Sequence, residues 1–245
     1  MSIHSTITKS MQANQKLFAV LIDPDDTSTK NISRLVELAE KAGVDFFFIG
    51  GSLMTKTNFS SVIHELKQNT EIPLVIFPGS IFQIDGEADA LLFLSLISGR
   101  NPDFLIGQHV HAAPHLKKSS LEIISTGYML IDGGNTSTAQ YISNTTPIPG
   151  DKTDIAVSTA IAGELIGQRL IYMDAGSGAR NPVAPEMISA VKKHTDIPLI
   201  TGGGIKTTEQ ARQACKAGAD VIVVGNAIEK SPELIQSFSG VVKSF

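Results

Sequence analysis

The sequence predicts a (β/α)8 barrel, because short apolar runs alternate with amphipathic segments along the chain. The runs are nearly continuous in aliphatic and β-branched residues, as expected for parallel strands that are covered on both faces. They span residues 17–22, 45–49, 74–77, 90–94, 123–131, 170–173, 199–201 and 221–224. Glycine-containing turns follow the last three runs, where this architecture commonly binds its ligands. We therefore predict an α/β fold, a TIM (β/α)8 barrel, as a single domain over residues 1–245.

Most of the expected strands are followed by a segment with helical periodicity. Apolar residues recur three and four positions apart in residues 32–42, 59–68, 185–193, 209–217 and 228–238, and a further helix is expected near residues 154–166. Residues 78–88 contain Pro78, Gly79 and Gly86 and fit a crossover helix poorly, so we expect a loop after the third strand. Residues 133–152 are predicted to form an extended rim loop, which often shapes a substrate site.

Composition narrows the class of protein. The formal net charge of −4 and the pI near 5.9 argue against a nucleic-acid-binding protein, which needs clustered Lys and Arg. A single cysteine, Cys215, excludes an internal disulfide and a cysteine-based zinc site, which fits a reducing compartment. The sequence contains neither a signal-peptide pattern nor an apolar run of the roughly 18 residues that span a membrane. We expect a cytoplasmic protein that holds any lipid in a groove, with at most transient contact with a membrane surface.

Three glycine-containing turns after consecutive late strands predict an anion site. They are residues 174–178, 202–204 and 225–226. Glycine lets backbone N–H groups approach an anion closely, and a following helix N-terminus adds about half a positive charge. Any one of these turns could be only a tight connection, but three in succession favour a phosphate site at the carboxyl rim of the barrel.

Carboxylates that end the first strand predict a magnesium site at the same rim. Asp23 is the candidate ligand, because Mg²⁺ commonly takes one or two protein carboxylates and completes its shell with water and phosphate oxygens. Asp25 and Asp26 are assigned to capping of the following helix. Ser52, after the second strand, could add an oxygen ligand, although a turn serine is at least as common in this position.

Asp174 lies beside the glycines of the turn after the sixth expected strand, residues 174–178, and is the candidate catalytic base for a substrate hydroxyl. Strand alternation places Tyr172 on the same face, where it either contacts the substrate or is a core aromatic residue. Arg100, after the fourth strand, could bind a diphosphate with two hydrogen bonds or form an ordinary ion pair.

The histidines His109, His111 and His115 are interpreted as surface or packing residues rather than as metal ligands. No carboxylate accompanies them at ligand spacing, and Pro114 should interrupt any helix that would align His111 with His115.

Taken in order, these motifs resemble the geranylgeranylglyceryl phosphate synthase family, including its bacterial heptaprenylglyceryl phosphate synthase relatives. The resemblance runs through nearly the whole chain. Its most specific parts are residues 21–25, 49–52, 98–102, 107–109, 172–178, 202–205 and 224–226. At residue 174 many members carry glutamate where this chain has aspartate, so the side chain of the expected base is one methylene shorter here.

The resemblance implies a magnesium-dependent prenyltransferase that forms an ether lipid. It would join the C3 hydroxyl of sn-glycerol 1-phosphate to C1 of a polyprenyl diphosphate, geranylgeranyl diphosphate in the first place, and release diphosphate. It also implies that the helix after the third strand is replaced by a loop and that the protein is a homo-oligomer. By this resemblance Asp23 and Ser52 bind Mg²⁺, Asp174 accepts the hydroxyl proton and Arg100 offsets charge on the diphosphate. Glycerol phosphate would be held by Tyr172, Met173, Asp174, Ala175, Gly176, Ser177, Gly178, Gly203, Gly204, Gly225 and Asn226.

Two other functions share the glycine turns. One is a different phosphate-binding barrel enzyme, such as a phosphosugar isomerase or a thiamine phosphate synthase-like transferase. The other is a non-catalytic barrel that binds a phosphorylated metabolite as a sensor or scaffold, against which the joint presence of Asp23, Ser52 and Asp174 argues.

Overall fold

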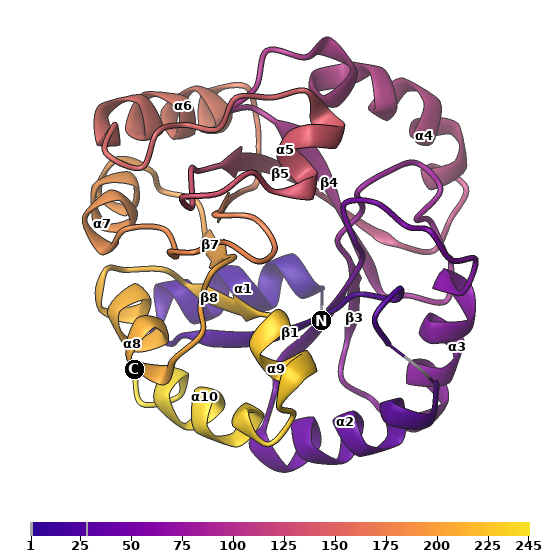
Figure 1. Cartoon of the computed structure of the whole chain (residues 1–245). Helices are drawn as coiled ribbons and strands as arrows, with labels where there is room; N and C mark the ends of the chain where they lie inside the picture. The colour runs from indigo at the N-terminus through magenta and orange to yellow at the C-terminus, as the bar shows by residue number, and fades with distance from the viewer. Residues whose placement is uncertain (1, 28) are drawn as a thin grey trace.

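A computed structural model of the chain describes residues 2–27 and 29–245, and its strands form one closed parallel barrel (Figure 1). Each strand pairs with the next along the chain, and β1 closes the barrel against β8. The strands are β1 (Leu17–Ile22), β2 (Phe46–Ile49), β3 (Leu74–Ile76), β4 (Ala90–Leu96), β5 (Glu122–Leu130), β6 (Leu170–Asp174), β7 (Leu199–Gly202) and β8 (Val221–Val224). The predicted TIM-barrel fold is confirmed.

Helices surround the barrel (Figure 1). They are α1 (Ile3–Gln12), α2 (Thr29–Ala42), α3 (Phe59–Asn69), α4 (Gln108–Leu116), α5 (Thr138–Ser143), α6 (Thr153–Leu165), α7 (Pro185–His194), α8 (Thr208–Lys216), α9 (Asn226–Lys230) and α10 (Leu234–Val242). A π-helical turn, η1 (Asp103–Gly107), leads directly into α4. Residues 77–89, which join β3 to β4, contain no helix, so the predicted loop after the third strand is confirmed. None of the helices in the described ranges is both long and apolar enough to span a membrane.

Three local predictions were wrong. Pro114 lies inside α4 rather than ending it; it removes one backbone hydrogen bond, but Val110, whose carbonyl would have accepted that bond, is on the exposed face. The single helix expected over residues 228–238 is two helices, because Pro232 cannot donate a backbone N–H between α9 and α10. The loop expected over residues 133–152 contains the short helix α5, whose first turn is capped by the side chain of Ser137.

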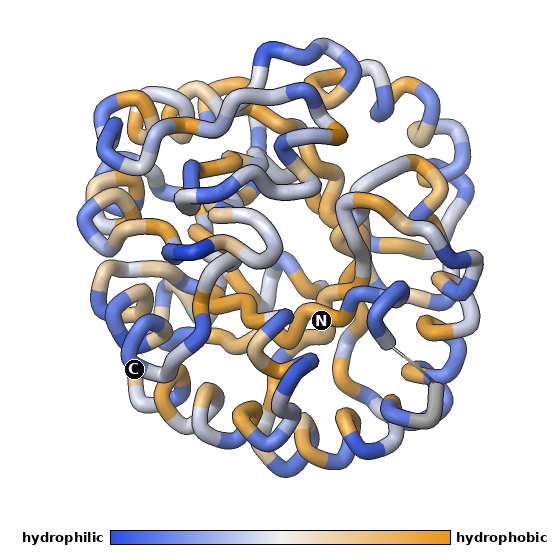
Figure 2. Tube along the Cα trace, in the orientation of Figure 1, coloured by the Kyte–Doolittle hydropathy of each residue, from blue (hydrophilic) through white to orange (hydrophobic). Residues whose placement is uncertain are grey.

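The apolar side chains form two layers, one inside the barrel and one between the barrel and the helices. Alternation along β6 divides its residues accordingly, with Tyr172 inside and Met173 outside. The hydropathy of the trace follows the same plan, with apolar strands at the centre (Figure 2). Helix α1, which the sequence did not predict, places Ile3 and Ile7 in the inner layer, and Glu122 at the start of β5 accepts the Ile3 N–H at 2.6 Å. The amino-terminal end is therefore filled, and a cavity forms at the carboxyl end.

Candidate active site

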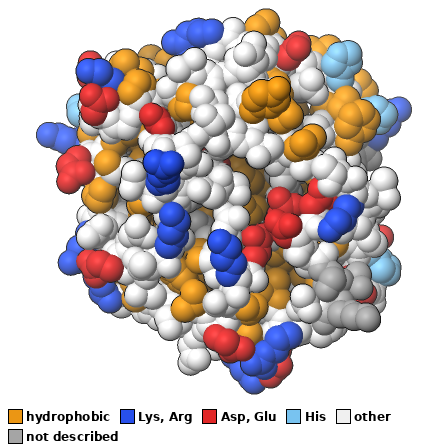
Figure 3. Space-filling model, in the orientation of Figure 1, with side chains coloured by type: hydrophobic (Ala, Val, Ile, Leu, Met, Phe, Trp, Pro, Cys, Tyr) orange, Lys and Arg blue, Asp and Glu red, His pale blue; other side chains and the backbone are white. Residues whose placement is uncertain are grey.

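A cavity of about 610 Å³ opens at the carboxyl end of the barrel. Its volume is that of a site for a small-molecule ligand of substantial size. Figure 3 shows the hollow near the centre of this face, with acidic side chains on one side of it and Lys and Arg on the other. The glycine turns after β6, β7 and β8 line one part of the cavity, and apolar residues of β4, α4 and α5 line another. One cavity therefore combines a polar end with an apolar groove.

The three glycine turns predicted to bind phosphate meet at the polar end. Asn226, the first residue of α9, accepts hydrogen bonds from the Gly178 N–H and the Ser177 hydroxyl, each at 3.2 Å. The turns after β6 and β8 are thus tied together. Gly203 has a φ of +75°, and a Cβ there would lie 2.3 Å from Oδ1 of Asp174, so only glycine fits between the two turns. The glycine turns and the start of α9 then border one end of the cavity, the part where an anion would bind.

Most of the predicted site residues line this one cavity. They are Asp23, Ser52, Tyr172, Asp174, Ser177, Gly178, Gly203, Gly204, Gly225 and Asn226. Met173 and Ala175 do not, because strand alternation turns them into the layer beneath the helices. Gly176 lies behind the cavity wall, where its N–H donates to Oδ1 of Asp174 at 2.7 Å. It positions a site residue rather than facing the ligand.

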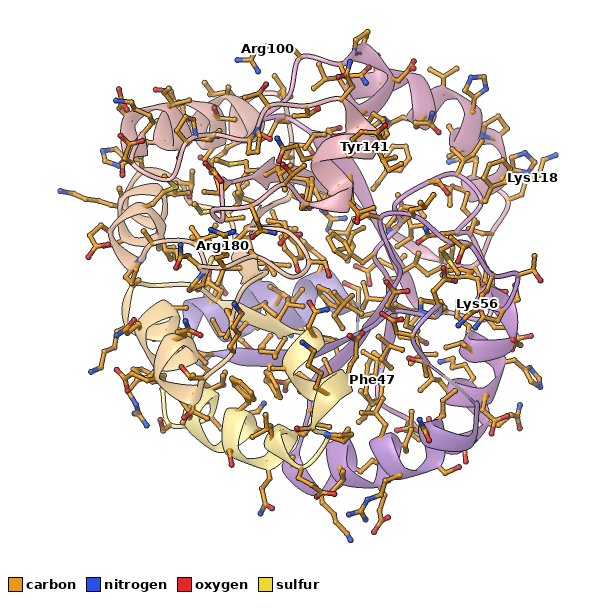
Figure 4. All side chains as sticks on the ribbon, viewed as in Figure 1. Phe47, Lys56, Arg100, Lys118, Tyr141 and Arg180 are labelled. Atoms are coloured by element: carbon orange, nitrogen blue, oxygen red, sulfur yellow. The ribbon has the colours of Figure 1, made fainter. Side chains whose placement is uncertain are left out.

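Arg100 lies outside this cavity. Its guanidinium donates to the carbonyl of Gly99 at 2.7 Å, and it lines a separate shallow pocket with Asn144 and Thr145. Figure 4 shows its side chain at the outer edge of the molecule, beyond the ring of helices. Its predicted contact with a diphosphate in the central cavity gains no support from this position.

Asp174 is nearly fully buried at the end of β6, with 7% of its surface exposed. Oδ1 accepts the Gly176 N–H, and Oδ2 accepts the hydroxyl of Tyr128 at 2.8 Å. Burial raises the pKa of Asp174 above its ordinary value, although both hydrogen bonds favour the ionised form. A carboxylate of raised pKa that faces a cavity can act as a general base.

Asp23 lines the cavity at the end of β1, and Ser52 does so after β2. A Cβ on Gly51 would lie 2.8 Å from Oδ2 of Asp23, so the glycine makes room for this carboxylate. Burial, together with the nearby carboxylates of Asp26 and Asp25, raises the pKa of Asp23. A divalent cation would relieve this accumulation of negative charge, and the oxygen donors suit Mg²⁺.

No group of three or more His, Cys, Asp or Glu side chains in the described part of the chain is arranged to hold a metal ion. An ion at Asp23 would therefore take most of its ligands from substrate and water, which is common for Mg²⁺. Asp25, expected to cap α2, accepts hydrogen bonds from the Thr55 N–H at 2.6 Å and from the Lys56 N–H at 3.1 Å. It ties the loops after β1 and β2 together.

The sequence did not reveal three residues that shape the site. Gln83, in the loop after β3, accepts the N–H of Gly51 at 3.3 Å and donates to its carbonyl at 2.7 Å, which fixes the turn that carries Ser52. Glu229 of α9 lines the cavity and accepts the Asp23 N–H at 3.4 Å; burial raises its pKa to about 7. Tyr128 is the third. All three act through contacts distant in sequence, which no local pattern encodes.

The histidines of α4 separate into two environments. His109 is buried beside the apolar groove, where Nε2 lies 3.1 Å from the hydroxyl of Ser95 and the ring packs edge-on against Phe93. His111 and His115 are exposed on the opposite face of the helix. The interpretation as packing and surface residues agrees with these positions.

Comparison with known proteins assigns the chain to a family. The model of the PcrB family matches residues 10–242. The chain belongs to the PcrB family. A geranylgeranylglyceryl phosphate synthase of Chitinophaga pinensis is 55% identical over 227 residues, which cover 93% of this chain and 90% of the relative. The resemblance inferred from the motifs is confirmed, and with it the enzyme class, a prenyltransferase of this family.

Solved structures of geranylgeranylglyceryl phosphate synthases are also similar to this PcrB-family chain. A crystal structure of (S)-3-O-geranylgeranylglyceryl phosphate synthase from Thermoplasma acidophilum, in complex with its substrate sn-glycerol-1-phosphate, matches with a TM-score of 0.94 and 33% identity over the whole of both chains. A thiamine phosphate pyrophosphorylase from Pyrococcus furiosus matches with a TM-score of 0.58 and 14% identity, covering 94% of this chain and 96% of that one. The match to the pyrophosphorylase shows only that the two proteins share a fold.

Proposed function

We propose that the protein joins the C3 hydroxyl of sn-glycerol 1-phosphate to C1 of a polyprenyl diphosphate, geranylgeranyl diphosphate in the first place, and releases diphosphate. The observation that carries this proposal is the single cavity in which three phosphate-binding turns meet an apolar groove. A transferase that forms an ether lipid needs both parts side by side. The Thermoplasma structure, similar over its full length, holds sn-glycerol-1-phosphate, which supports this choice of acceptor.

The residues of the cavity divide the chemistry between them. Backbone N–H groups of the turns at Gly203 and Asn226, beside the Ser177–Gly178 turn, would hold the phosphate of the acceptor. Asp174 would take up the proton that the C3 hydroxyl loses as its oxygen attacks C1 of the prenyl group. Asp23 and Ser52 would hold Mg²⁺, which, when bound, offsets the charge that develops on the diphosphate leaving group.

The prenyl chain would lie in the apolar groove. Its walls come from the β3–β4 loop, β4, η1, α4 and α5. The lining residues are Ile81, Ile84, Leu91, Phe93, Leu94, Leu96, Phe104, Ala112, Leu116 and Ile142. Burial of an isoprenoid chain there gains about 25 cal/mol per Å² of apolar surface removed from water. Ile142 on α5 lines this groove and is 40% exposed, which supports transient contact with a membrane surface as the donor enters.

The proposal includes action in the cytoplasm as a homo-oligomer. The one cysteine, Cys215, is free and buried and has no second cysteine in the sequence to form an internal disulfide with, which fits a reducing compartment. Sedimentation of the purified protein would determine its oligomeric state.

Product analysis tests the proposed reaction. Radiolabelled sn-glycerol 1-phosphate is incubated with C15, C20 and C35 prenyl diphosphates, with Mg²⁺ and with a chelator. We expect a labelled ether product with the C20 donor and Mg²⁺, and loss of that product with the chelator. Binding of glycerol phosphate without any ether from the three donors would instead favour a non-catalytic phosphometabolite-binding barrel, and failure to bind it would favour a different phosphate-binding enzyme.

A further inference from the structure

Both oxygens of the candidate base are already held by groups of the protein. Oδ1 of Asp174 accepts the Gly176 N–H. It also lies close to Gly203, where a Cβ in place of the glycine hydrogen would be only 2.3 Å from this oxygen. Oδ2 accepts the hydroxyl of Tyr128 at 2.8 Å. Each oxygen of the carboxylate therefore already accepts one hydrogen bond from the protein, and the phenol that donates to Oδ2 lines the cavity as well. This arrangement raises the question of how a substrate proton reaches it.

Tyr128 contacts both the candidate base, Asp174, and the cavity. It is on β5 in register with Tyr172 of β6, it lines the cavity, and 8% of its surface is exposed. Phe77 and Tyr172 hold its ring, each with the ring centres 5.8 Å apart. Because its hydroxyl donates to Asp174, the phenol oxygen has lone pairs left to accept one hydrogen bond from a ligand.

We propose that Tyr128 is a catalytic residue that relays the proton of the acceptor hydroxyl to Asp174. The proposal rests on the proposed function. As the C3 oxygen forms its bond to C1 of the prenyl group, the C1–O bond to diphosphate breaks and diphosphate keeps the electron pair. The C3 hydroxyl proton passes to the Tyr128 oxygen while the Tyr128 proton passes to Oδ2 of Asp174. The tyrosine ends neutral, Asp174 ends protonated, and Asp174 later returns the proton to water.

The pKa shifts of Tyr128 and Asp174 agree with this order of proton transfers. Burial, and the charge of Asp174 next to it, raise the pKa of Tyr128 well above its ordinary value, so the phenol keeps its proton between turnovers. Burial also raises the pKa of Asp174, which makes it a stronger acceptor.

The test is a double-mutant cycle on Tyr128→Phe and Asp174→Glu, with ether formation from labelled glycerol phosphate as the assay. In the native background we expect Tyr128→Phe to lower kcat about 100-fold, with KM for glycerol phosphate changed less than about twofold. In the Asp174→Glu background the longer carboxylate reaches the hydroxyl directly, so the same change should cost less than about fivefold. Tyr141→Phe is the matched control, because Tyr141 is 79% exposed and outside the cavity lining, and kcat should stay unchanged.

Equal losses from Tyr128→Phe in both backgrounds, or a loss carried by KM, would overturn the relay and leave Tyr128 with a structural role. If Asp174→Glu is itself inactive, single-turnover rates of the native enzyme in mixtures of light and heavy water decide the question. Two protons in flight give a curved dependence on the deuterium fraction, whereas a linear dependence contradicts the relay. A native enzyme that makes no ether refutes the proposed function, whereas ether formation that tolerates Tyr128→Phe refutes only the relay.

Discussion

Asp45, Asp89 and Asp220, at the amino-terminal end of the barrel, are bonded to strand backbone and paired with lysines. In contrast, Asp174 and Glu229 at the carboxyl end face a cavity and have raised pKa values. At the amino-terminal end, three aspartates each precede a strand and repeat one arrangement. Asp45, Asp89 and Asp220 accept the backbone N–H of a neighbouring strand at 2.7–2.9 Å, and each forms an ion pair with a lysine. The donors are Phe18, Leu74 and Leu199, and the lysines are Lys243, Lys67 and Lys192.

The same side-chain type therefore serves two ends of one barrel in opposite ways. At the amino-terminal end, its charge is neutralised and its oxygens fix the strand ends, which stabilises the fold. At the carboxyl end, the raised pKa values of Asp174 and Glu229 show that their charge costs folding free energy, and we propose that this charge serves the ligand and the reaction. The comparison teaches that a carboxylate's partners, rather than its burial, separate structural from functional positions: Asp220 and Asp174 are both buried, at 2% and 7% exposed.

The largest effect is expected from Asp174→Asn, which keeps the shape but removes the base. We expect kcat to fall about 10³-fold or more, because general acid–base catalysis contributes about 10²–10⁴-fold. Glycerol phosphate binding, measured by calorimetry, should remain within about threefold, since the turns that hold the phosphate are intact. Native turnover in this variant would contradict the contrast between the two ends of the barrel, because Asp174 would then be no more catalytic than the aspartates at the amino-terminal end.

Asp220→Ala probes the structural end. Its carboxylate accepts the Leu199 N–H at 2.9 Å and the ammonium of Lys192 at 2.6 Å, so removal leaves buried donors without a partner. We expect the free energy of unfolding to fall by about 3–5 kcal/mol, measured by urea denaturation. The folded variant should keep native KM and kcat. Asp151→Ala is the control, since Asp151 is 78% exposed in its ion pair with Lys152 and should cost less than about 1 kcal/mol.

Asp23→Asn tests whether the rim carboxylate of β1 belongs to the functional set. We expect ether formation at saturating prenyl diphosphate to fall about 100-fold at low Mg²⁺ and to recover in part at high Mg²⁺, because the metal loses a charged ligand. Glycerol phosphate binding in a chelator should not change. Native turnover and an unaltered Mg²⁺ dependence would remove Asp23 from the proposed metal site.

The sequence predicted the barrel well because apolar periodicity is local and each strand reports its own burial. It located the three glycine turns for the same reason, since glycine indicates a turn directly, and these turns line one cavity. The contacts that complete the site are long-range: Tyr128 and Asp174 are 46 residues apart, and Gln83 reaches Gly51 across 32. The diphosphate contact predicted for Arg100 stays a prediction: its side chain lies outside the central cavity, and a position after a strand does not determine which way a loop side chain points.

The smallest effect expected here is the pH-dependent gain in stability of Glu229→Gln. It tests whether the carboxylates at the carboxyl end of the barrel lower the stability of the fold. The pKa of Glu229 is raised from 4.5 to about 7, chiefly by burial. The folded state therefore binds this proton more tightly than the unfolded state, so stability falls as pH rises from 4.5 to about 7 and then stays level. Glutamine carries no charge to bury and can still accept the Asp23 N–H. In a chelator, the variant should equal the native protein below pH 4.5 and exceed it by about 1–2 kcal/mol at pH 8, after allowance for partial exposure. Thermal unfolding across this range measures the difference, and a difference that does not vary with pH would mean that Glu229 is compensated as fully as the aspartates of the amino-terminal end.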